Sequence, residues 1–354
     1  MSAPAGVHQV AAGAAPRDAI THHMLEARDV LRAHGLRSEI FVEGEHIHPT
    51  LVGDVHPVTH WDRVTAPGDA AILHYSIASP AFFHVLDRCA RCAIHYHNIT
   101  PAELLWRYAP NIALECAIGR RRLAELAGRV SPVGADSAYN AHELEELGFG
   151  PGTVLGIMRQ PLAPTPRLPR ADGERVKLLF VGRGVPNKAQ HHLVMASAAL
   201  ADAGVDHELW LVGAWTAVPP YTDHCRALAD ALGVADRVRF IGSVTEQELA
   251  QRYADADLFL CLSDHEGFCV PLLEAMAAGL PIVAYASSAI PETLGQAGLL
   301  LDEKTPSLVA EAVVEALTNP LLTARFDAAR AAQLERFDHD AVTGRLLAFV
   351  EEIR

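Results

Sequence analysis

The chain has little of what marks secreted, nucleic-acid-binding or membrane-spanning proteins. Only 6 of its 354 residues are cysteine, and they are scattered, which is typical of a reducing compartment. Lysine and arginine number 29 against 43 aspartates and glutamates, so the formal charge of −14 argues against nonspecific nucleic-acid binding. No apolar run reaches the roughly 18 residues of a membrane span, and no secretory signal opens the chain. We therefore expect a cytoplasmic protein.

What is present suits a globular protein with two domains. Half of the residues are apolar and a fifth are charged, as in soluble folded proteins. Aromatic residues make up 6% and alanine is abundant, which is expected of helices packed closely on sheets. A chain of 354 residues is long enough for two separate cores.

Strand-like apolar segments alternate with helical patterns in the first 160 residues. A helix is indicated by Ile20, Met24, Ala27 and Leu31, which fall on one face, with Gly35 as its stop. The strand candidates are 7–10, 40–42, 69–74, 92–97, 129–133 and 153–157. Strands that alternate with helices imply a parallel sheet that is covered on both faces.

A proline-rich segment divides this half from a second alternating half. Residues 158–172 contain four prolines and little periodicity, which is typical of a linker. The later strand candidates are 176–181, 208–212, 238–241, 258–262, 282–284 and 298–301. We predict an α/β protein with two doubly wound, Rossmann-like domains facing across a cleft. Its expected parts are a first domain at 1–160, a linker at 161–172, a second domain at 173–337 and a final helix at 338–354.

The most informative stretch is DHEGFCVPLLEAMAAGLPIVA, residues 264–284. Pro271 fits the first turn of a helix, so Glu266 should lie on a loop and Glu274 in the first helical turn. Between them lie free backbone N–H groups at the positive end of a helix dipole, which favour a phosphate. Carboxylates in such places can accept hydrogen bonds from paired sugar hydroxyls. The stretch therefore suits a sugar nucleotide, although two glutamates alone would usually be solvated groups at a turn.

The surroundings of the glutamates resemble a known signature. The strand before them, the Ser263 turn, Glu-Gly-Phe, the helix, Gly279-Leu280-Pro281 and the strand after are similar to retaining glycosyltransferase family 4, which has the GT-B fold. In that family two glutamates separated by seven residues lie in the carboxyl-terminal domain. The resemblance is strong from about residue 176 to 305 and diffuse over 7–160. It implies transfer of a sugar from a nucleoside diphosphate to an acceptor hydroxyl.

Two cations open the second domain. Arg183 and Lys188 follow a strand that ends in a glycine turn, and both can reach one anionic point. Alone they would usually be surface cations. By resemblance they bind the donor's phosphates and stabilise the leaving diphosphate, where negative charge develops. The family normally has glycine after this lysine, whereas this chain has Ala189.

The resemblance implies further donor-binding positions. Gly213 and Val244 match positions near the nucleotide base, although alone they are ordinary strand-end turns. Cys269 replaces the family's glycine after Glu-Gly-Phe, and Ser287-Ser288 stand where the family often has glycines. The implied substrate-binding residues are Gly13, Arg183, Lys188, Gly213, Val244, Glu266, Gly267, Phe268, Cys269, Val270 and Glu274.

First-domain residues are implied less directly. His97 ends a strand, where the family often has a histidine that faces the sugar and acceptor; otherwise it would simply bond a neighbour. Its expected catalytic partners are Glu266, Arg183 and Lys188. Gly13 matches a loop that approaches the donor phosphates, although the usual double glycine is absent. Ser137, Tyr139 and Asn140 resemble a Ser-x-x-Asn stretch that either lines the cleft or caps a helix.

We expect no metal and no cofactor. Cys89 and Cys92 form a Cys-x-x-Cys with His95 and His97 just beyond, and these residue types bind zinc. A buried strand that begins at Cys92 accounts for them more simply, because no second Cys-x-x-Cys exists. The two donor-site cations and a helix amino terminus can supply the charge compensation that Mg²⁺ or Mn²⁺ supplies elsewhere.

We therefore predict a metal-independent retaining glycosyltransferase that uses a UDP- or GDP-sugar. The acceptor is a sugar, a lipid-linked sugar or a small metabolite. Arg120, Arg121 and Arg122 form either a solvated helix face or a patch for peripheral attachment at the inner membrane face. Two alternatives remain: a sugar-nucleotide epimerase of similar architecture, and a non-catalytic sugar-nucleotide-binding protein. Transfer, isomerisation or mere binding of a labelled donor separates the three.

Overall fold

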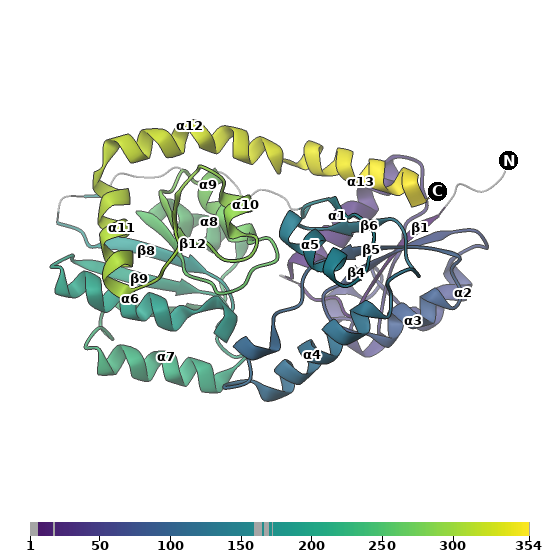
Figure 1. Ribbon diagram of the computed structural model, residues 1–354, viewed down its shortest axis with the longest axis horizontal. Coiled ribbons are helices and arrows are strands. Elements are labelled where there is room, and N and C mark those ends of the chain that lie inside the picture. Colours follow the sequence, from purple (N-terminus) through teal and green to yellow (C-terminus); the bar gives the residue numbers. More distant parts are fainter. Residues whose placement is uncertain (1–5, 17, 159–164, 166–169, 172, 354) are drawn as a thin grey trace. The chain divides into compact units, whose positions relative to one another are not determined.

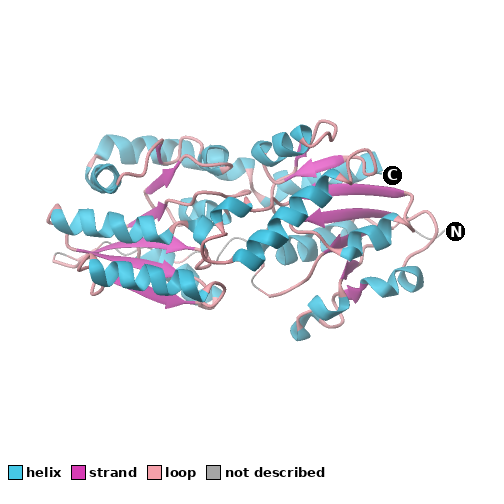
Figure 2. Ribbon diagram, turned by 60° about the horizontal axis from the view of Figure 1, so that its bottom comes forward, coloured by secondary structure: helices cyan, strands magenta, loops and turns pink. Residues whose placement is uncertain are grey.

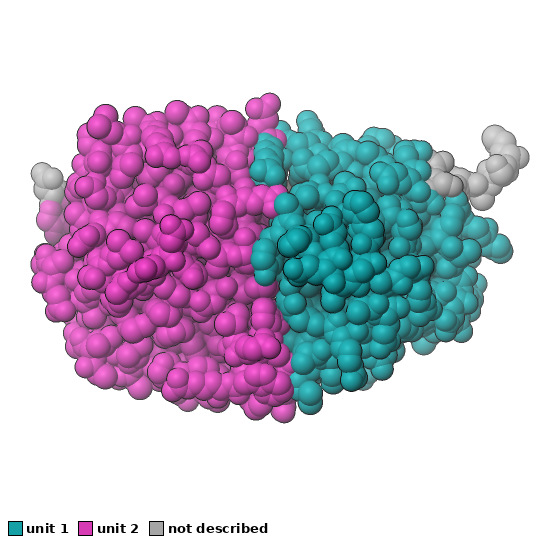
Figure 3. All heavy atoms as spheres, viewed as in Figure 1, with its two compact units in different colours: residues 1–99, 114–160, 336–354 teal, residues 100–113, 161–335 magenta. Residues whose placement is uncertain are grey.

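The chain folds into two compact units (Figure 3). The computed structural model describes residues 6–16, 18–158, 165, 170–171 and 173–353. Unit 1 contains residues 1–99, 114–160 and 336–354, and unit 2 contains residues 100–113 and 161–335. Most of the predicted linker, 161–172, lies outside the described residues.

Unit 1 is built on a seven-stranded sheet in which all neighbouring strands run parallel (Figure 1). The strand order is β3-β2-β1-β4-β5-β6-β7. The strands are β1 (Val7–Ala11), β2 (Ile40–Val42), β3 (His56–Pro57), β4 (Ala70–Tyr75), β5 (Arg91–Tyr96), β6 (Val133–Ala135) and β7 (Thr153–Val154). Its helices are α1 (Ala19–Ala33), α2 (Trp61–Val64), α3 (Pro80–Leu86), α5 (Ala138–Glu146) and α13 (His339–Ile353), with short 3₁₀ turns η1 (Gly44–His46), η2 (Pro49–Leu51) and η3 (Val58–His60).

The last helix of the chain completes the core of unit 1. Leu346, Phe349 and Val350 of α13 are buried together with Ile72 of β4 and Ala93 of β5. Buried apolar side chains on one face of α13 explain why it forms although no later strand follows it. The C-terminal segment thus returns to a sheet whose strands lie between residues 7 and 154.

One predicted strand begins later than its sequence indicates. Residues 129–133 were expected to form a strand, but β6 starts at Val133. Pro132 lacks an N–H group and cannot donate to a ladder, although its carbonyl accepts a hydrogen bond from the Ile94 N–H. The apolar pattern therefore marks the approach to the strand rather than the strand itself.

Unit 2 is built on a six-stranded parallel sheet with the order β10-β9-β8-β11-β12-β13. The strands are β8 (Val176–Val181), β9 (His207–Val212), β10 (Val238–Gly242), β11 (Leu258–Cys261), β12 (Ile282–Tyr285) and β13 (Leu299–Leu301). The helices are α6 (Gln190–Asp202), α7 (Pro219–Ala231), α8 (Glu246–Asp255), α9 (Val270–Ala277), α10 (Ile290–Leu294), α11 (Pro306–Thr318) and α12 (Pro320–Arg336), with turns η4 (Ala102–Leu104) and η5 (Pro186–Lys188). Helix α4 (Pro110–Ala124) starts in the residues of unit 2 and continues in those of unit 1.

Helices cover both faces of the unit 2 sheet (Figure 2). From β8 the chain moves outward through β9 to β10, and from β11 it moves the opposite way to β13. Because β-α-β crossovers are right-handed, the helices of the two runs lie on opposite faces. The direction of winding reverses between β8 and β11, which are neighbours. Such a switch point is where doubly wound sheets bind ligands, at the carboxyl ends of the strands.

Residues 100–113 pack within unit 2. The Tyr108 ring lies 5.2 Å from the Tyr221 ring and 5.4 Å from that of His224, both on α7. These edge and tilted contacts are typical of aromatic packing. Over the described part of the chain, no helix is both long enough and apolar enough to span a bilayer.

Candidate functional site

The predicted donor residues of unit 2 gather at the carboxyl edge of its sheet. Arg183 and Lys188 follow β8, and Glu266 follows β11, so they lie on either side of the switch point. Gly213 follows β9 and Val244 follows β10, which are the next strands outward. Parallel strands place all these loops along one edge. Residues up to 87 positions apart, from Arg183 to Val270, therefore share that edge.

Glycine is required where two of these loops meet. A Cβ atom on Gly213 would lie 2.1 Å from the carbonyl oxygen of Gly182, and Gly213 has φ of 140°. A Cβ atom on Gly184 would lie 2.4 Å from the Trp215 ring. Backbones can approach this closely only without a side chain. The turns after β8 and β9 are therefore fixed against each other.

Lys188 and Glu266 form an ion pair at the centre of the site. The Lys188 Nζ atom lies 2.5 Å from Glu266 Oε2, and the side chains are 21% and 7% exposed. Burial alone would lower the pKa of Lys188, but the neighbouring Glu266 carboxylate outweighs it and raises that pKa above its usual value. Lys188 therefore stays charged, and a cation and a carboxylate are held side by side at the switch point.

The loop that carries Glu266 is braced by two serines. The Glu266 N–H donates to Ser288 Oγ at 2.7 Å, and Ser287 Oγ donates to the Ser263 carbonyl at 2.6 Å. Further along the loop, Thr293 Oγ1 donates to the Phe268 carbonyl at 2.5 Å. These bonds tie the end of β11 to the chain after β12. The Ser287-Ser288 pair therefore has a structural role in holding this loop.

Three residues that stand in place of expected glycines have left-handed backbones. Ala189 has φ of 52°, Cys269 has φ of 71° and Ser288 has φ of 45°. An L-residue with a Cβ atom is disfavoured in this region by roughly 1–2 kcal/mol. The site thus keeps a glycine-type backbone although the side chains have changed. The Cys269 side chain lies with Cys261 and Glu266, with ligand atoms within 4.8 Å of one another.

The second glutamate is oriented by a tyrosine that sequence reasoning did not select. Glu274 lies on α9, and its Oε2 atom accepts a hydrogen bond of 2.6 Å from the Tyr253 hydroxyl on α8. The Tyr253 hydroxyl also lies 3.4 Å from the Pro271 carbonyl. Twenty-one residues separate the partners, and only the packing of α8 beside α9 brings them together. Lys304 donates to Asp264 and to the Leu262 carbonyl. Sequence reasoning did not select it either, because these contacts too depend on how distant segments pack.

Arg183 differs from Lys188 in being exposed. Its carbonyl accepts a bond of 2.7 Å from Gln190 Nε2, which fixes the backbone after β8. Among the described residues, no hydrogen bond or ion pair of its guanidinium is found. An exposed guanidinium on the same sheet edge as a buried ion pair can bind an added anion without losing an existing partner. Gly267, Phe268 and Val270 complete the loop that leads into α9.

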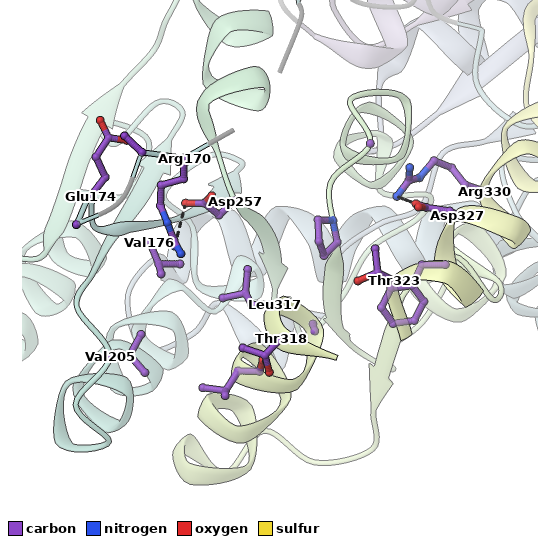
Figure 4. Close-up of a pocket in the computed structure, with 17 residues that line it drawn as sticks. Arg170, Glu174, Val176, Val205, Asp257, Leu317, Thr318, Thr323, Asp327 and Arg330 are labelled. Atoms are coloured by element: carbon purple, nitrogen blue, oxygen red, sulfur yellow. Dashed lines mark hydrogen bonds and ion pairs between the residues drawn. The ribbon is translucent and has the colours of Figure 1, made fainter. Parts of the chain in front are cut away.

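A pocket in unit 2 lies at the other end of the strands (Figure 4). The pocket has a volume of about 680 Å³ and is lined by Arg170, Val176, Asp257, Pro281 and Phe326, among others. Val176 and Asp257 stand at the amino ends of β8 and β11. The Asp257 carboxylate, part of an Asp-x-Asp triplet at 255–257, accepts the Lys177 N–H at 2.8 Å. Neither this pocket nor the triplet adjoins the candidate donor residues.

In unit 1, His97 is engaged on both sides of its ring. Its Nδ1 atom lies 2.9 Å and 3.0 Å from the Asp136 oxygens, and its Nε2 atom lies 2.8 Å from His74 Nδ1. Its side chain is 1% exposed. Both ring nitrogens are therefore used within unit 1. The following residue, Asn98, has φ of 77° and donates to Asn140 Oδ1 at 2.8 Å.

The other first-domain candidates have local structural uses. Ser137 caps α5, because its Oγ atom accepts the Asn140 N–H at 3.2 Å. Gly13 follows β1, and a Cβ atom there would lie 3.1 Å from the His46 Cβ. Cys89 and Cys92 bond to nearby carbonyl oxygens, and the groups of described residues that could hold a metal do not join them to His95 or His97.

The match to a family model supplies part of the identification. Residues 166–333 match the model described as glycosyl transferases group 1. A GDP-mannose-dependent α-(1-6)-phosphatidylinositol monomannoside mannosyltransferase from Mycolicibacterium smegmatis is 32% identical over 296 residues, which cover 77% of this chain and 74% of that protein. The chain belongs to the group 1 glycosyltransferases. The predicted membership of glycosyltransferase family 4 is thereby confirmed.

A second relative matches over a shorter stretch, and a solved structure shares the fold. The protein of the same description from Mycobacterium tuberculosis is 38% identical over 154 residues, or 41% of this chain and 39% of that one. The match thus spans about two fifths of the relative's length. The structure of a sucrose-phosphate synthase from Thermosynechococcus elongatus superposes with a TM-score of 0.78 at 16% identity, covering 98% and 99% of the two chains. The predicted GT-B fold of two Rossmann-like units is confirmed.

A glycine at position 189 tests whether the left-handed backbone is strained. The variants Ala189→Gly and Ala196→Gly each remove a fully buried methyl group. In α6, Ala196→Gly also costs about 1 kcal/mol of helix propensity, whereas Ala189→Gly relieves roughly 1–2 kcal/mol of strain. We expect Ala189→Gly to be more stable than Ala196→Gly by about 2–3 kcal/mol in urea unfolding, which is the sum of the two effects. A difference of only about 1 kcal/mol, the helix-propensity cost alone, would show that position 189 is unstrained.

Proposed function

We propose that this glycosyltransferase retains the donor's anomeric configuration and uses a nucleoside-diphosphate sugar, with GDP-mannose as the favoured donor. The Lys188–Glu266 pair at the switch point carries the proposal, because it places a phosphate-binding cation next to a hydroxyl-binding carboxylate. GDP-mannose is favoured because the two mycobacterial relatives described above are GDP-mannose-dependent by name.

The unit 2 site offers a distinct group for each part of the donor. Arg183 and Lys188 would bind the diphosphate, together with the backbone N–H groups at the start of α9. Glu274, held by the Tyr253 hydroxyl, would accept hydrogen bonds from the ribose hydroxyls. Glu266 would accept them from the sugar. The backbone groups of Gly213 and Val244 would contact the nucleotide base.

The charges of the site suit a front-face displacement. Lys188 stays charged, and Arg183 is an exposed cation, so both can stabilise the diphosphate as it leaves. The leaving diphosphate would itself take the proton of the acceptor hydroxyl. A double displacement would require a carboxylate nucleophile at the sugar. Glu266 is the carboxylate that we assign to the sugar, but its Oε2 atom is held by Lys188.

We also propose that the transfer needs no metal cofactor. Two cationic side chains and the amino terminus of α9 provide positive charge where the diphosphate would lie. Of the two Asp-x-Asp triplets in the sequence, 338–340 belongs to unit 1. The other, at 255–257, lies at the opposite end of β11, a strand of four residues that is about 13 Å long. A triplet at that distance cannot coordinate a metal bound to the donor's phosphates.

The acceptor proposal rests on the mycobacterial relatives and on the surface of α4. Both relatives named above act, by name, on phosphatidylinositol monomannoside. Four exposed residues of α4 share one face, because Ile118 lies four positions after Leu114, and Arg121 and Arg122 lie three and four positions after Ile118. Arg120 instead turns inward to Glu143 at 2.6 Å. We propose a lipid-linked acceptor and peripheral attachment at the inner membrane face.

Stereochemistry of the product is the direct test of the reaction. The protein is incubated with GDP-α-mannose and a phosphatidylinositol mannoside, and the new linkage is read by NMR. We expect an α-mannoside, since front-face displacement keeps the configuration. A β-linked product would contradict the mechanism. Isomerisation of the donor without an acceptor would favour the epimerase, and binding without either reaction would favour the non-catalytic alternative.

Removing Glu274 should weaken nucleotide binding. A hydrogen bond to a charged group is worth roughly 1.5–3 kcal/mol, so Glu274→Ala should lower the affinity for GDP by about one to two decades. Isothermal titration with GDP and with UDP measures this effect. The exposed Glu311 on α11 provides a charge-matched control, Glu311→Ala, which should bind GDP like the wild type. Unchanged affinity of Glu274→Ala for both nucleotides would contradict the ribose assignment.

Attachment to anionic lipid should depend on the two outward arginines of α4. Each basic residue contributes about 1 kcal/mol near an anionic surface, so Arg121→Gln/Arg122→Gln should weaken binding to phosphatidylinositol-containing vesicles by about 30-fold at low salt. The variant Arg63→Gln/Arg88→Gln changes the net charge equally on exposed residues elsewhere in unit 1. Co-sedimentation compares them. Equal binding by both double variants would rule out the α4 face.

A further inference from the structure

A cluster of four histidines and an aspartate lies in the core of unit 1. His74 of β4 pairs in register with His95 of β5, and His97 lies two residues further along. His23 of α1 covers them, with ring centroids 5.4 Å from His74, 4.9 Å from His95 and 5.6 Å from His97. His23, His74, His95 and Asp136 are at most 1% exposed. Such a concentration of imidazole inside a parallel sheet calls for an explanation.

Several ring nitrogens in this cluster have no hydrogen-bond partner among the described residues. They are His23 Nε2, His74 Nε2 and both nitrogens of His95. The His95 Nε2 atom lies 2.8 Å from Asp136 Oδ1 but lacks the alignment of a hydrogen bond. Each unsatisfied buried polar atom costs about 1–3 kcal/mol. One nitrogen from each of His23, His74 and His95 lies within 4.8 Å of the other two, so the three rings present nitrogens to one region.

The hydrogen bonds around the cluster determine which nitrogens carry lone pairs. The His97 Nδ1 atom lies 2.9 Å and 3.0 Å from the two Asp136 oxygens, and an ionised carboxylate only accepts hydrogen bonds. His97 must therefore donate from Nδ1 and accept at Nε2. His74 must then donate from Nδ1. The Nε2 atom of His74 is thus left with a lone pair and without a hydrogen-bond partner among the described residues.

We propose that His74, His95 and His23 form a binding site for one divalent transition-metal ion, with zinc as the reference ion. Neutral imidazole is the commonest protein ligand for such ions. A metal-binding histidine typically donates its other ring N–H to an acceptor that orients it, and His74 Nδ1 is bonded in this way to His97 Nε2. Zinc–nitrogen bonds of about 2.0–2.1 Å would require the three nitrogens to close slightly, to about 3.4 Å from one another.

The three histidines are not equivalent as ligands. His23 Nδ1 accepts the Met158 N–H at 2.9 Å, so in this state its Nε2 atom carries the proton. To bind a metal through Nε2, His23 must give up that hydrogen bond. His74 and His95 face no such cost. A water molecule could also contact these atoms, but it would not require the Asp136–His97 pair behind His74. The metal would join α1 to β4 and β5.

The test measures metal content and affinity on the full chain, so it is independent of glycosyl transfer. Purified protein is stripped with a chelator, loaded with Zn²⁺ or Co²⁺, and dialysed. We expect one ion per chain, visible absorption typical of Co²⁺ held tetrahedrally by the three histidines and one water, and a higher unfolding temperature with metal than without. A chain that retains no stoichiometric metal after loading overturns the proposal and leaves water as the occupant.

Variants locate the ion within the cluster. We expect His74→Gln and His95→Gln to lose about 100-fold or more in zinc affinity, and Asp136→Asn to lose about 10–100-fold. His23→Gln should lose less than His74→Gln, because it also removes the competing bond to Met158. His22→Gln, on the exposed side of α1, is the matched control and should bind like the wild type. Circular dichroism checks that each variant is folded. Full zinc affinity in a folded His74→Gln variant overturns the proposal.

Discussion

The buried ion pair between Lys188 and Glu266 is the constraint on which the candidate site of unit 2 depends. A charge that loses its water must be paired, or it destabilises the fold by several kcal/mol. Here each residue is the other's partner at 2.5 Å. A bound donor would offer phosphate to the lysine and hydroxyls to the glutamate. Each charged group would then exchange its present partner for one on the donor, and neither would be left unpaired. The ion pair thus holds the two groups ready without a bound ligand.

That pairing requires a fixed backbone on both sides of the switch point. The close approach of Gly213 to Gly182 fixes the turns after β8 and β9, and Ser288 fixes the amide of Glu266. Ala189 and Cys269 adopt left-handed conformations next to the two charged residues. Side chains are therefore accepted at strained positions so that the path of the backbone is preserved. At these positions the left-handed backbone conformation is kept, although the glycine that usually adopts it is not.

Much of this arrangement could be predicted from sequence because its signals are local. Val176–Val181 reads as a strand and is one, and Glu266 and Glu274 stand in one continuous strand–loop–helix stretch. The hydrogen bond from Tyr253 to Glu274 could not be predicted, since it depends on how α8 lies against α9. The burial of α13 depends likewise on a sheet formed some 250 residues earlier. Contacts between elements follow from packing, which periodicity does not encode.

The histidine cluster of unit 1 could not be predicted from sequence either, and its hydrogen bonds constrain what His97 can do. His95 and His97 were visible as neighbours in sequence, but His23, His74 and Asp136 join them only through strand register and the placement of α1. Because Asp136 and His74 occupy both nitrogens of His97, that ring cannot also hydrogen-bond a sugar without releasing one of them. A contribution of His97 to substrate binding would then act through its position: it fixes the end of β5, where Asn98 turns in a left-handed conformation. The part of His97 in the reaction would therefore be to shape the backbone of the site, with its ring committed to the core.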